Sequence, residues 1–292
     1  MIITRDDTIP SAMLKTLRGL LHSLPDPTPF TWLEEQIQDL KETVANANFY
    51  LTYTLIGQKF GDEGVTVGDT TGDVCLAYLK DHQATWPEVA RIYLIAELLA
   101  DQGEAYLGGV KKITEVADSK ELITFLKYVF FLPYAGTFIH TATDALRTNI
   151  APVFDAIALN NPYPEHYFNE QQWNQMYLKA AFMQRPLLQI WGVENRANLT
   201  LSRIISDYAH ERWAASRDID PHIWRPVAFA PVDAIKADMQ HLLENGTEEE
   251  VHAAVLVAIL SNNEELMEMV SSRKEILERI ANKTLNWNNL KL

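Results

Sequence analysis

The chain has 292 residues, of which 47% are hydrophobic and 22% charged, so it can bury a sizeable core and is neither disordered nor fibrous in composition. Its formal net charge is −14, from 25 Lys plus Arg against 39 Asp plus Glu. This sign argues against nucleic acid and anionic membrane surfaces as partners, because both are bound through basic side chains. The single cysteine, Cys75, excludes an internal disulfide and a cysteine-based zinc site.

The first residues, MIITRDDTIP, lack the basic and then apolar pattern of a secretory signal. The longest uncharged run, 128–143, contains Pro133 and Gly136 and is shorter than the roughly 18 to 20 residues that span a bilayer. We therefore expect a cytoplasmic protein that does not span a membrane.

The N-terminal part predicts amphipathic helices. One extends from Pro10 to Leu24, and a second begins at Thr28 and continues towards Phe60, because apolar residues recur at helical spacing over that whole range. The Gly- and Asp-rich segment 61–72 contains no phosphate-binding glycine motif. It is predicted to be a surface loop, with a lid or a small hairpin as the alternative.

Helical patterns fill the rest of the chain. Asn169 is expected to cap a helix that carries the sequence WNQM, Asn198 to cap the helix from Leu199 to Ser216, and Thr247 to form a capping box with Glu250. No convincing strand is present and no fixed repeat length is found. The prediction is an all-α fold, an irregular stack of antiparallel helix pairs of the α–α superhelix or HEAT-like type. We expect one helical domain over 1–292, with an N-terminal subdomain over 1–132 as an option.

The region 147–225 contains four of the seven tryptophans, interleaved with polar side chains where a plain helical core would have Leu or Ala. Polar groups are costly to bury without partners, so they must bind each other, the backbone or a ligand. The predicted ligand-binding residues are Asn149, Trp173, Asn174, Asn195, Arg196, Trp213, Trp224 and Arg225.

The helix 199–216 also carries the candidate catalytic residues Asp207, His210 and Glu211. Asp207 lies three residues before His210, so it can orient that imidazole for acid–base chemistry. The alternative is a structural ion-pair network. His210 and Glu211 begin an HExxH zinc motif, but position 214 is Ala, so neither a metal nor a cofactor is expected.

The same region resembles the EboA family of metabolite-traffic proteins. The matching phrases are RTNIAPVFDAIALNNPYP from Arg147, FNEQQWNQMYLKAAF from Phe168, GVENRAN from Gly192, DYAHERWAASR from Asp207 and WRPV from Trp224. Ser216 departs from the glycine expected there. The resemblance implies a helical protein that helps to handle or route a secondary metabolite and supplies no catalytic motif.

Three hypotheses follow. The first is a non-catalytic protein that binds a small aromatic or prenylated metabolite, or proteins of the same operon, in a groove formed by the tryptophan-rich region. The second is an enzyme that uses His210 with Asp207, and the third is a structural adaptor in which the polar residues serve helix packing alone.

Overall fold

The computed structural model describes residues 8–290, and these residues are mostly helical. Among them, extended pairing is confined to one isolated bridge between Gly64 and Thr85. The predicted all-α class is therefore confirmed. Stacking of helix pairs into a superhelix stays a prediction.

The chain divides into two compact units, unit 1 over 1–157 and unit 2 over 158–292. The division falls at the end of α9 (Ala151–Ala158), and position 132, the option for a subdomain boundary, lies inside unit 1. The two units are described separately below.

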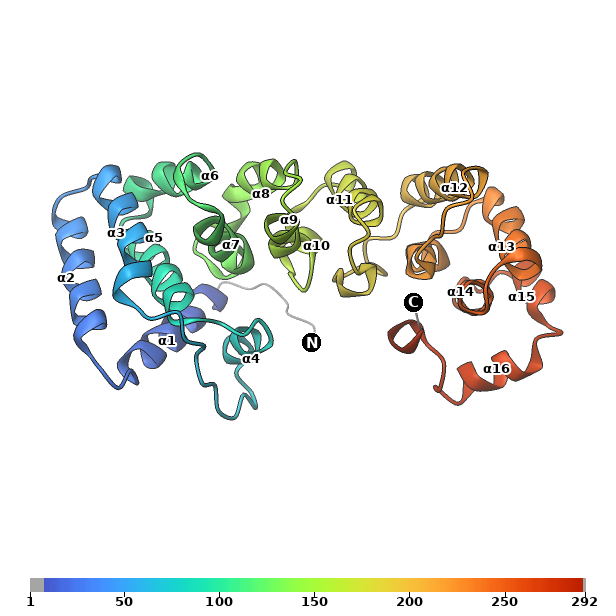
Figure 1. The fold of residues 1–292 in the computed structure, drawn as a ribbon, viewed down its shortest axis with the longest axis horizontal. Coiled ribbons are helices and arrows are strands. Elements are labelled where there is room, and N and C mark those ends of the chain that lie inside the picture. The colour runs from blue at the N-terminus through green and yellow to red at the C-terminus, as the bar shows by residue number, and fades with distance from the viewer. Residues whose placement is uncertain (1–7, 291–292) are drawn as a thin grey trace. The chain divides into compact units, whose positions relative to one another are not determined.

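Unit 1 (Figure 1, blue to green) contains ten helices or helical turns before α9 among the described residues. They are α1 (Ile9–His22), α2 (Thr28–Glu42), α3 (Asn46–Lys59), α4 (Val74–Asp81), α5 (Trp86–Lys111), α6 (Ile113–Val116), α7 (Ser119–Tyr128), η1 (Val129–Phe131), η2 (Ala135–Phe138) and α8 (Ile139–Ala145).

The centre of unit 1 is α5, which packs against α1, α2, α3 and α7. It starts with a capping box between Thr85 and Glu88, and the segment from Val89 to Leu99 is almost entirely buried. The helix kinks at Gln102, whose φ of −132° and ψ of 48° are not helical. A Cβ at the next residue, Gly103, would lie 2.4 Å from the Tyr134 ring, so a side chain there would require that half-exposed ring to shift.

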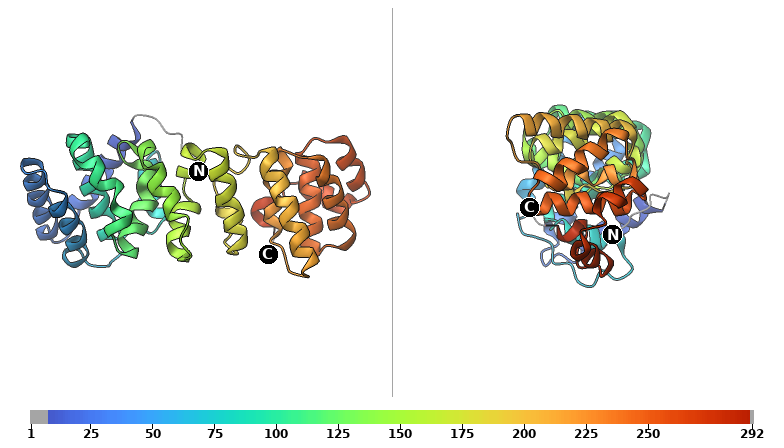
Figure 2. Two further views of the ribbon diagram at one scale, coloured as in Figure 1. Left: turned by 90° about the horizontal axis from the view of Figure 1, so that it is seen from above. Right: turned by 90° about the vertical axis from the view of Figure 1, so that its right-hand side faces the viewer.

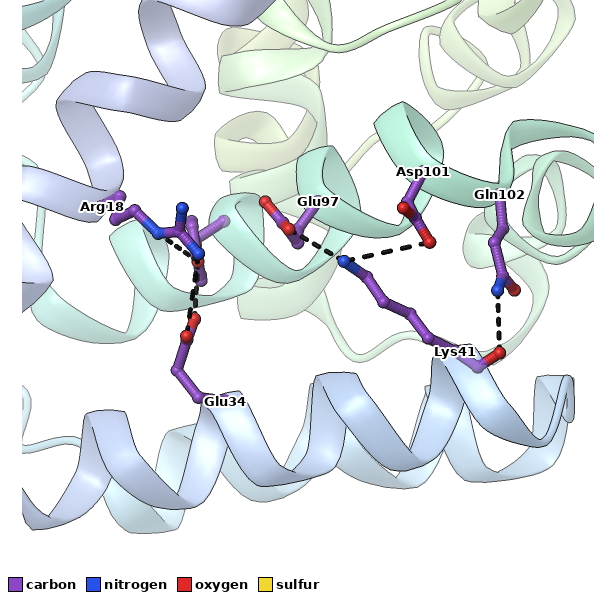
Figure 3. Close-up of polar contacts among 7 residues, drawn as sticks. Arg18, Glu34, Lys41, Glu97, Asp101 and Gln102 are labelled. Atoms are coloured by element: carbon purple, nitrogen blue, oxygen red, sulfur yellow. Dashed lines mark hydrogen bonds and ion pairs between the residues drawn. The ribbon is translucent and has the colours of Figure 1, made fainter.

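Polar contacts attach α5 to its neighbours (Figure 3). Lys41 on α2 lies 2.9 Å from Glu97 and 3.9 Å from Asp101, and the Gln102 amide donates to the carbonyl oxygen of Lys41 at 2.8 Å. Arg18 on α1 and Glu34 on α2 both contact the Tyr93 hydroxyl. In unit 1 these charged side chains therefore join α1 and α2 to α5.

The prediction of one helix from Thr28 to Phe60 is wrong. The backbone is extended at Thr43 and Ala45, and the chain turns back between α2 and α3. Two short helices can both pack on α5. One straight helix over the same residues would be roughly 50 Å long, so part of it would not contact α5.

Unit 2 (Figure 1, yellow to red) contains the remaining elements. They are α10 (Tyr163–Tyr167), α11 (Glu170–Phe182), η3 (Leu187–Gln189), α12 (Leu199–Ala214), η4 (Pro221–Trp224), η5 (Pro226–Phe229), α13 (Asp233–Asn245), α14 (Glu248–Leu260), α15 (Glu264–Val270), α16 (Lys274–Ala281) and η6 (Trp287–Asn289).

The centre of unit 2 is α14, which packs against α13, α15, α16 and the two turns η4 and η5. Its residues from Ala253 to Ala258 are buried, and small alanines there allow neighbours to approach closely. Figure 2 shows α12, α13 and α14 side by side. The predicted caps at Asn169, Asn198 and Thr247 are confirmed, each accepting a hydrogen bond from a backbone N–H of the first helical turn.

Candidate functional site

Helix α12 carries or adjoins most of the candidate residues, and its start is fixed by two asparagines. Asn174 on α11 and Asn198 exchange two hydrogen bonds, with N–O distances of 3.1 and 2.9 Å. The Oδ1 atom of Asn198 also accepts from the N–H of Leu201 at 2.8 Å. The inward-facing amide of Asn174 is thus satisfied by another part of the chain and joins α11 to α12.

Asn195 and Arg196 make contacts within the chain that close the end of α10. Arg196 donates to the carbonyl oxygens of Glu165 and Phe168 at 2.6 and 2.7 Å, and its guanidinium lies 5.1 Å from the centre of the Trp173 ring. Burial lowers the pKa of Arg196, although two nearby glutamates oppose this. Asn195 donates to the Glu165 carboxylate at 2.8 Å.

The partner of His210 is not Asp207, and this corrects the predicted pairing. His210 donates from Nε2 to Oδ1 of Asp238 on α13, at 2.7 Å. Asp207 is exposed and forms no hydrogen bond or ion pair with any described residue, because its face of α12 points to solvent. Glu211 is exposed as well. The Asp238 side chain is fully buried, whereas that of His210 is 59% exposed.

Aromatic rings extend the His210 pair into a cluster. Trp213 stacks on the buried Trp224 with 6.0 Å between ring centroids. The centroid of the Trp213 ring also lies 4.1 Å from that of His241 and 5.4 Å from that of His210. We call these four residues and Asp238 the α12–α13 cluster. It binds α12 to α13 and to η4 through ring contacts and one charge-assisted hydrogen bond.

The remaining candidates lie apart from these groups. Arg225 pairs with Glu194 at 2.6 Å and donates to the Leu188 carbonyl oxygen. Asn149 belongs to unit 1, where it is exposed and has no hydrogen-bond partner among the described residues.

The candidates of unit 2 therefore do not converge on one site: most belong to two groups along α12, and Asp207, Glu211 and Arg225 lie outside both. From Asn198 to His210 is a rise of roughly 18 Å along α12, at 1.5 Å per residue. The first group orders the start of the helix, and the α12–α13 cluster orders its second half.

Between these helices the structure contains a hollow that the sequence did not reveal. It lies at the C-terminal ends of α11 and α12, and its volume is about 340 Å³. We call it the α11–α12 hollow. Its lining residues are Ala181, Gln184, Arg185, Pro186, Tyr208, Arg212, Asp218, Ile219, Asp220 and Pro221.

The walls of this hollow are mainly apolar, and its charged groups have distinct surroundings. Arg212 donates from Nε to the Asp218 carbonyl oxygen at 3.1 Å, a second bond runs from Nη2 to the same oxygen, and the guanidinium lies 6.0 Å from the centre of the Tyr208 ring. The Asp220 carboxylate accepts from the N–H and from Nδ1 of His222, both at 2.9 Å.

Hollows also occur elsewhere in the described part of the chain, and two of them are considered with the α11–α12 hollow. One lies between α1 and the start of α4, and the other between the starts of α13 and α15. None of the eleven predicted site residues lines any of these three hollows. The α11–α12 hollow is formed by chain turns that follow two helix ends, and only Pro186 and Pro221 signal them in the sequence.

Comparison with known proteins identifies a family. The model of a family described as "Metabolite traffic protein EboA" matches residues 13–228. No curated protein sequence and no solved structure matches the chain. Within residues 8–290 no helix is both long and apolar enough to cross a membrane, and no group of three or more His, Cys, Asp or Glu side chains is arranged to hold a metal ion.

Proposed function

The chain belongs to the EboA family of metabolite traffic proteins, and on this premise we propose that it binds a small metabolite, without transforming it, in the α11–α12 hollow. The observation that carries the proposal is the hollow itself. Its volume of about 340 Å³ and its lining of apolar side chains together with polar and charged ones suit a small molecule.

The position of the hollow in the chain supports the proposal. All of its lining residues fall between 181 and 221, inside the region 13–228 that matches the family. The walls are apolar at Ala181, Pro186, Ile219 and Pro221, so an aromatic or prenylated body would gain contact area there.

The predicted site residues enter this proposal as the frame of the hollow. The Asn174–Asn198 pair fixes α11 against α12 at one end, and the stack of Trp213 on Trp224 holds the other end of α12 against η4. The Tyr177 hydroxyl donates to the His222 carbonyl oxygen at 3.1 Å, which joins the middle of α11 to η4 as well. A hollow fixed in this way needs little reorganisation on binding, which favours affinity.

An enzyme that uses His210 has less support. His210 lines none of the three hollows, and its Nε2 is occupied by Asp238. The same observations leave His210 a role in holding α12 against α13, as the adaptor hypothesis expects.

The test is native mass spectrometry of the protein purified from its own host. We expect a small molecule to co-purify with the wild type and to be lost from Ala181→Leu, which narrows the hollow. Ala215→Leu is the matched control, because this alanine is exposed at the end of α12 and lies outside the hollow. Equal retention by both variants would place the binding site elsewhere, and loss from both would point to altered folding, which a thermal unfolding curve checks.

A further inference from the structure

We propose that the metabolite bound in the α11–α12 hollow carries an acidic group, and that Arg212 binds it. This inference rests on the proposed function and adds the chemical class of the ligand. A molecule with an apolar body and one carboxylate, sulfonate or phosphate group would fit the apolar walls and the guanidinium together.

The first argument is that the Arg212 guanidinium is fixed in place and still has donors to offer. Two of its nitrogens, Nε and Nη2, hold the Asp218 carbonyl oxygen, and its plane lies near the Tyr208 ring. Of the five N–H groups of an arginine, those on Nη1 donate to no atom of the described chain. A guanidinium positioned in this way can form the forked hydrogen bonds that suit an anion.

The second argument is that the positive charge of Arg212 has no counter-charge in the chain. No carboxylate of the described residues lies within ion-pair distance of it, whereas Arg225 is paired with Glu194. Arg196 donates its hydrogen bonds to backbone carbonyl oxygens. Arg212 is therefore an arginine at the hollow with no counter-charge among the described residues, so an acidic ligand can pair with it.

The two carboxylates at the edge of the hollow do not cancel this charge. Asp220 is occupied by His222, whose other ring nitrogen donates to the Trp287 carbonyl oxygen at 3.0 Å. The Asp220 carboxylate accepts from the backbone N–H of His222 and lies 2.9 Å from its Nδ1, and no ion pair joins it to Arg212. Asp218 is exposed, so water weakens the effect of its carboxylate on Arg212 without removing it.

The net charge of −14 would repel an anion at long range, but this repulsion is screened beyond about 8 Å at physiological salt. The affinity for an acidic ligand therefore depends mainly on its contact with Arg212 inside the hollow. An anionic probe and a neutral probe of similar shape can test this.

The test uses two fluorescent probes with the same aromatic body, 8-anilinonaphthalene-1-sulfonate and the neutral N-phenyl-1-naphthylamine. We expect the sulfonate to bind the wild type about tenfold more tightly, since hydrogen bonds to a charged group are the strong ones. Ala181→Leu should weaken both probes, which places them in the hollow.

The variants test the assignment to Arg212. Arg212→Gln should remove the advantage of the sulfonate and leave the neutral probe unchanged, and Arg212→Lys should keep part of it. Arg203→Gln is the matched control, since this arginine lies on the same helix, exposed, unpaired among the described residues and outside the hollow. Asp218→Asn should tighten sulfonate binding a few-fold by removing a nearby negative charge.

The outcomes separate the two proposals. Equal affinity of the wild type for both probes, or weaker sulfonate binding by Asp218→Asn, would overturn the acidic ligand while leaving the hollow as a binding site. If neither probe binds in the hollow, the proposed function fails together with this inference. Should Arg212→Gln not fold, the probe ratio in the wild type and the Asp218→Asn result still decide the matter.

Discussion

The two units use their charged side chains differently. In unit 1 two ion pairs are largely buried between helices, with Arg91 and Glu121 at 8% and 4% side-chain exposure and Lys127 and Glu88 at 17% and 13%, although the pair of Arg147 with Asp144 is mostly exposed. In unit 2 the pair of Lys236 with Glu265 is exposed, and the pair of Arg225 with Glu194 is partly exposed. The two buried pairs stabilise the framework of unit 1, whereas in unit 2 the charged side chain of Arg212 lines an open hollow.

This contrast predicts the largest effect for Glu121 in unit 1. Its carboxylate lies 3.7 Å from Arg91, which also donates to the Tyr53 carbonyl oxygen. Glu121→Gln keeps the shape but leaves a buried guanidinium without its counter-charge, so we expect a loss of about 3 kcal/mol in unfolding free energy. Urea unfolding followed by circular dichroism measures it. Lys236→Gln, which breaks the exposed pair, should leave the midpoint unchanged, and equal effects would remove the distinction between the units.

In unit 2 the largest stability effect is expected at the amide pair. Asn174→Ala leaves the half-buried Asn198 without two of its hydrogen bonds, which should cost about 2 kcal/mol. The neighbouring Gln175 is exposed, so Gln175→Ala is the control. If the Asn174→Ala protein keeps its stability but no longer binds its metabolite, Asn174 contacts the ligand and is not mainly structural.

A smaller effect is expected at His210, which is largely exposed. His210→Ala leaves the buried carboxylate of Asp238 without its partner, so we expect a loss of about 1 kcal/mol. Asp207→Ala should have no effect, since Asp207 has no partner in the described chain. Similar losses in both variants, measured by urea unfolding, would contradict the assignment of Asp238 as the partner.

A half-buried histidine in unit 1, His82, should make the stability of the protein depend on pH. Burial lowers the pKa of His82 from its ordinary value of 6.5, and its ring is stacked on Tyr78 while Nδ1 donates to the Tyr78 carbonyl oxygen. The unfolded chain then binds the proton more readily than the folded one. The contribution of His82 is present in full above pH 6.5 and falls as the pH drops from there through the folded-state pKa. His82→Phe keeps the stack and should flatten the dependence of the unfolding midpoint on pH between about pH 7.5 and about pH 5.5.

Local features of the fold were predictable from sequence, and contacts between distant segments were not. Asn169, Asn198 and Thr247 were correct as caps because each binds an N–H within three residues of itself. Asp238 could not be assigned to His210, because 28 residues separate them and several carboxylates lie closer in sequence.

The hollow was missed for the same reason. Its walls come from chain turns after two separate helices, so no periodic pattern marks them. Of the residues that stand out in sequence, Trp173 and Trp224 are buried in the packing, and Asn174 and Asn198 hydrogen-bond to each other across two helices. In this part of the molecule, an unusual residue indicated where helices are joined, and the open space lies beside those joints.

The smallest effect concerns Ser216, at the end of α12 next to the hollow. Its φ of +51° lies in the left-handed region, which costs a residue with a side chain about 1 kcal/mol and glycine nothing. Ser216→Gly also makes the unfolded chain more flexible, which offsets part of the gain, so we expect a net stabilisation of about 0.5 kcal/mol. Ala215→Gly is the control with the opposite sign, because Ala215 has a φ of −92° and gains nothing from a glycine. The midpoints of thermal unfolding of these two variants should therefore shift in opposite directions. If both midpoints fall, the Ser216 side chain stabilises the helix end by contacts that outweigh its backbone strain.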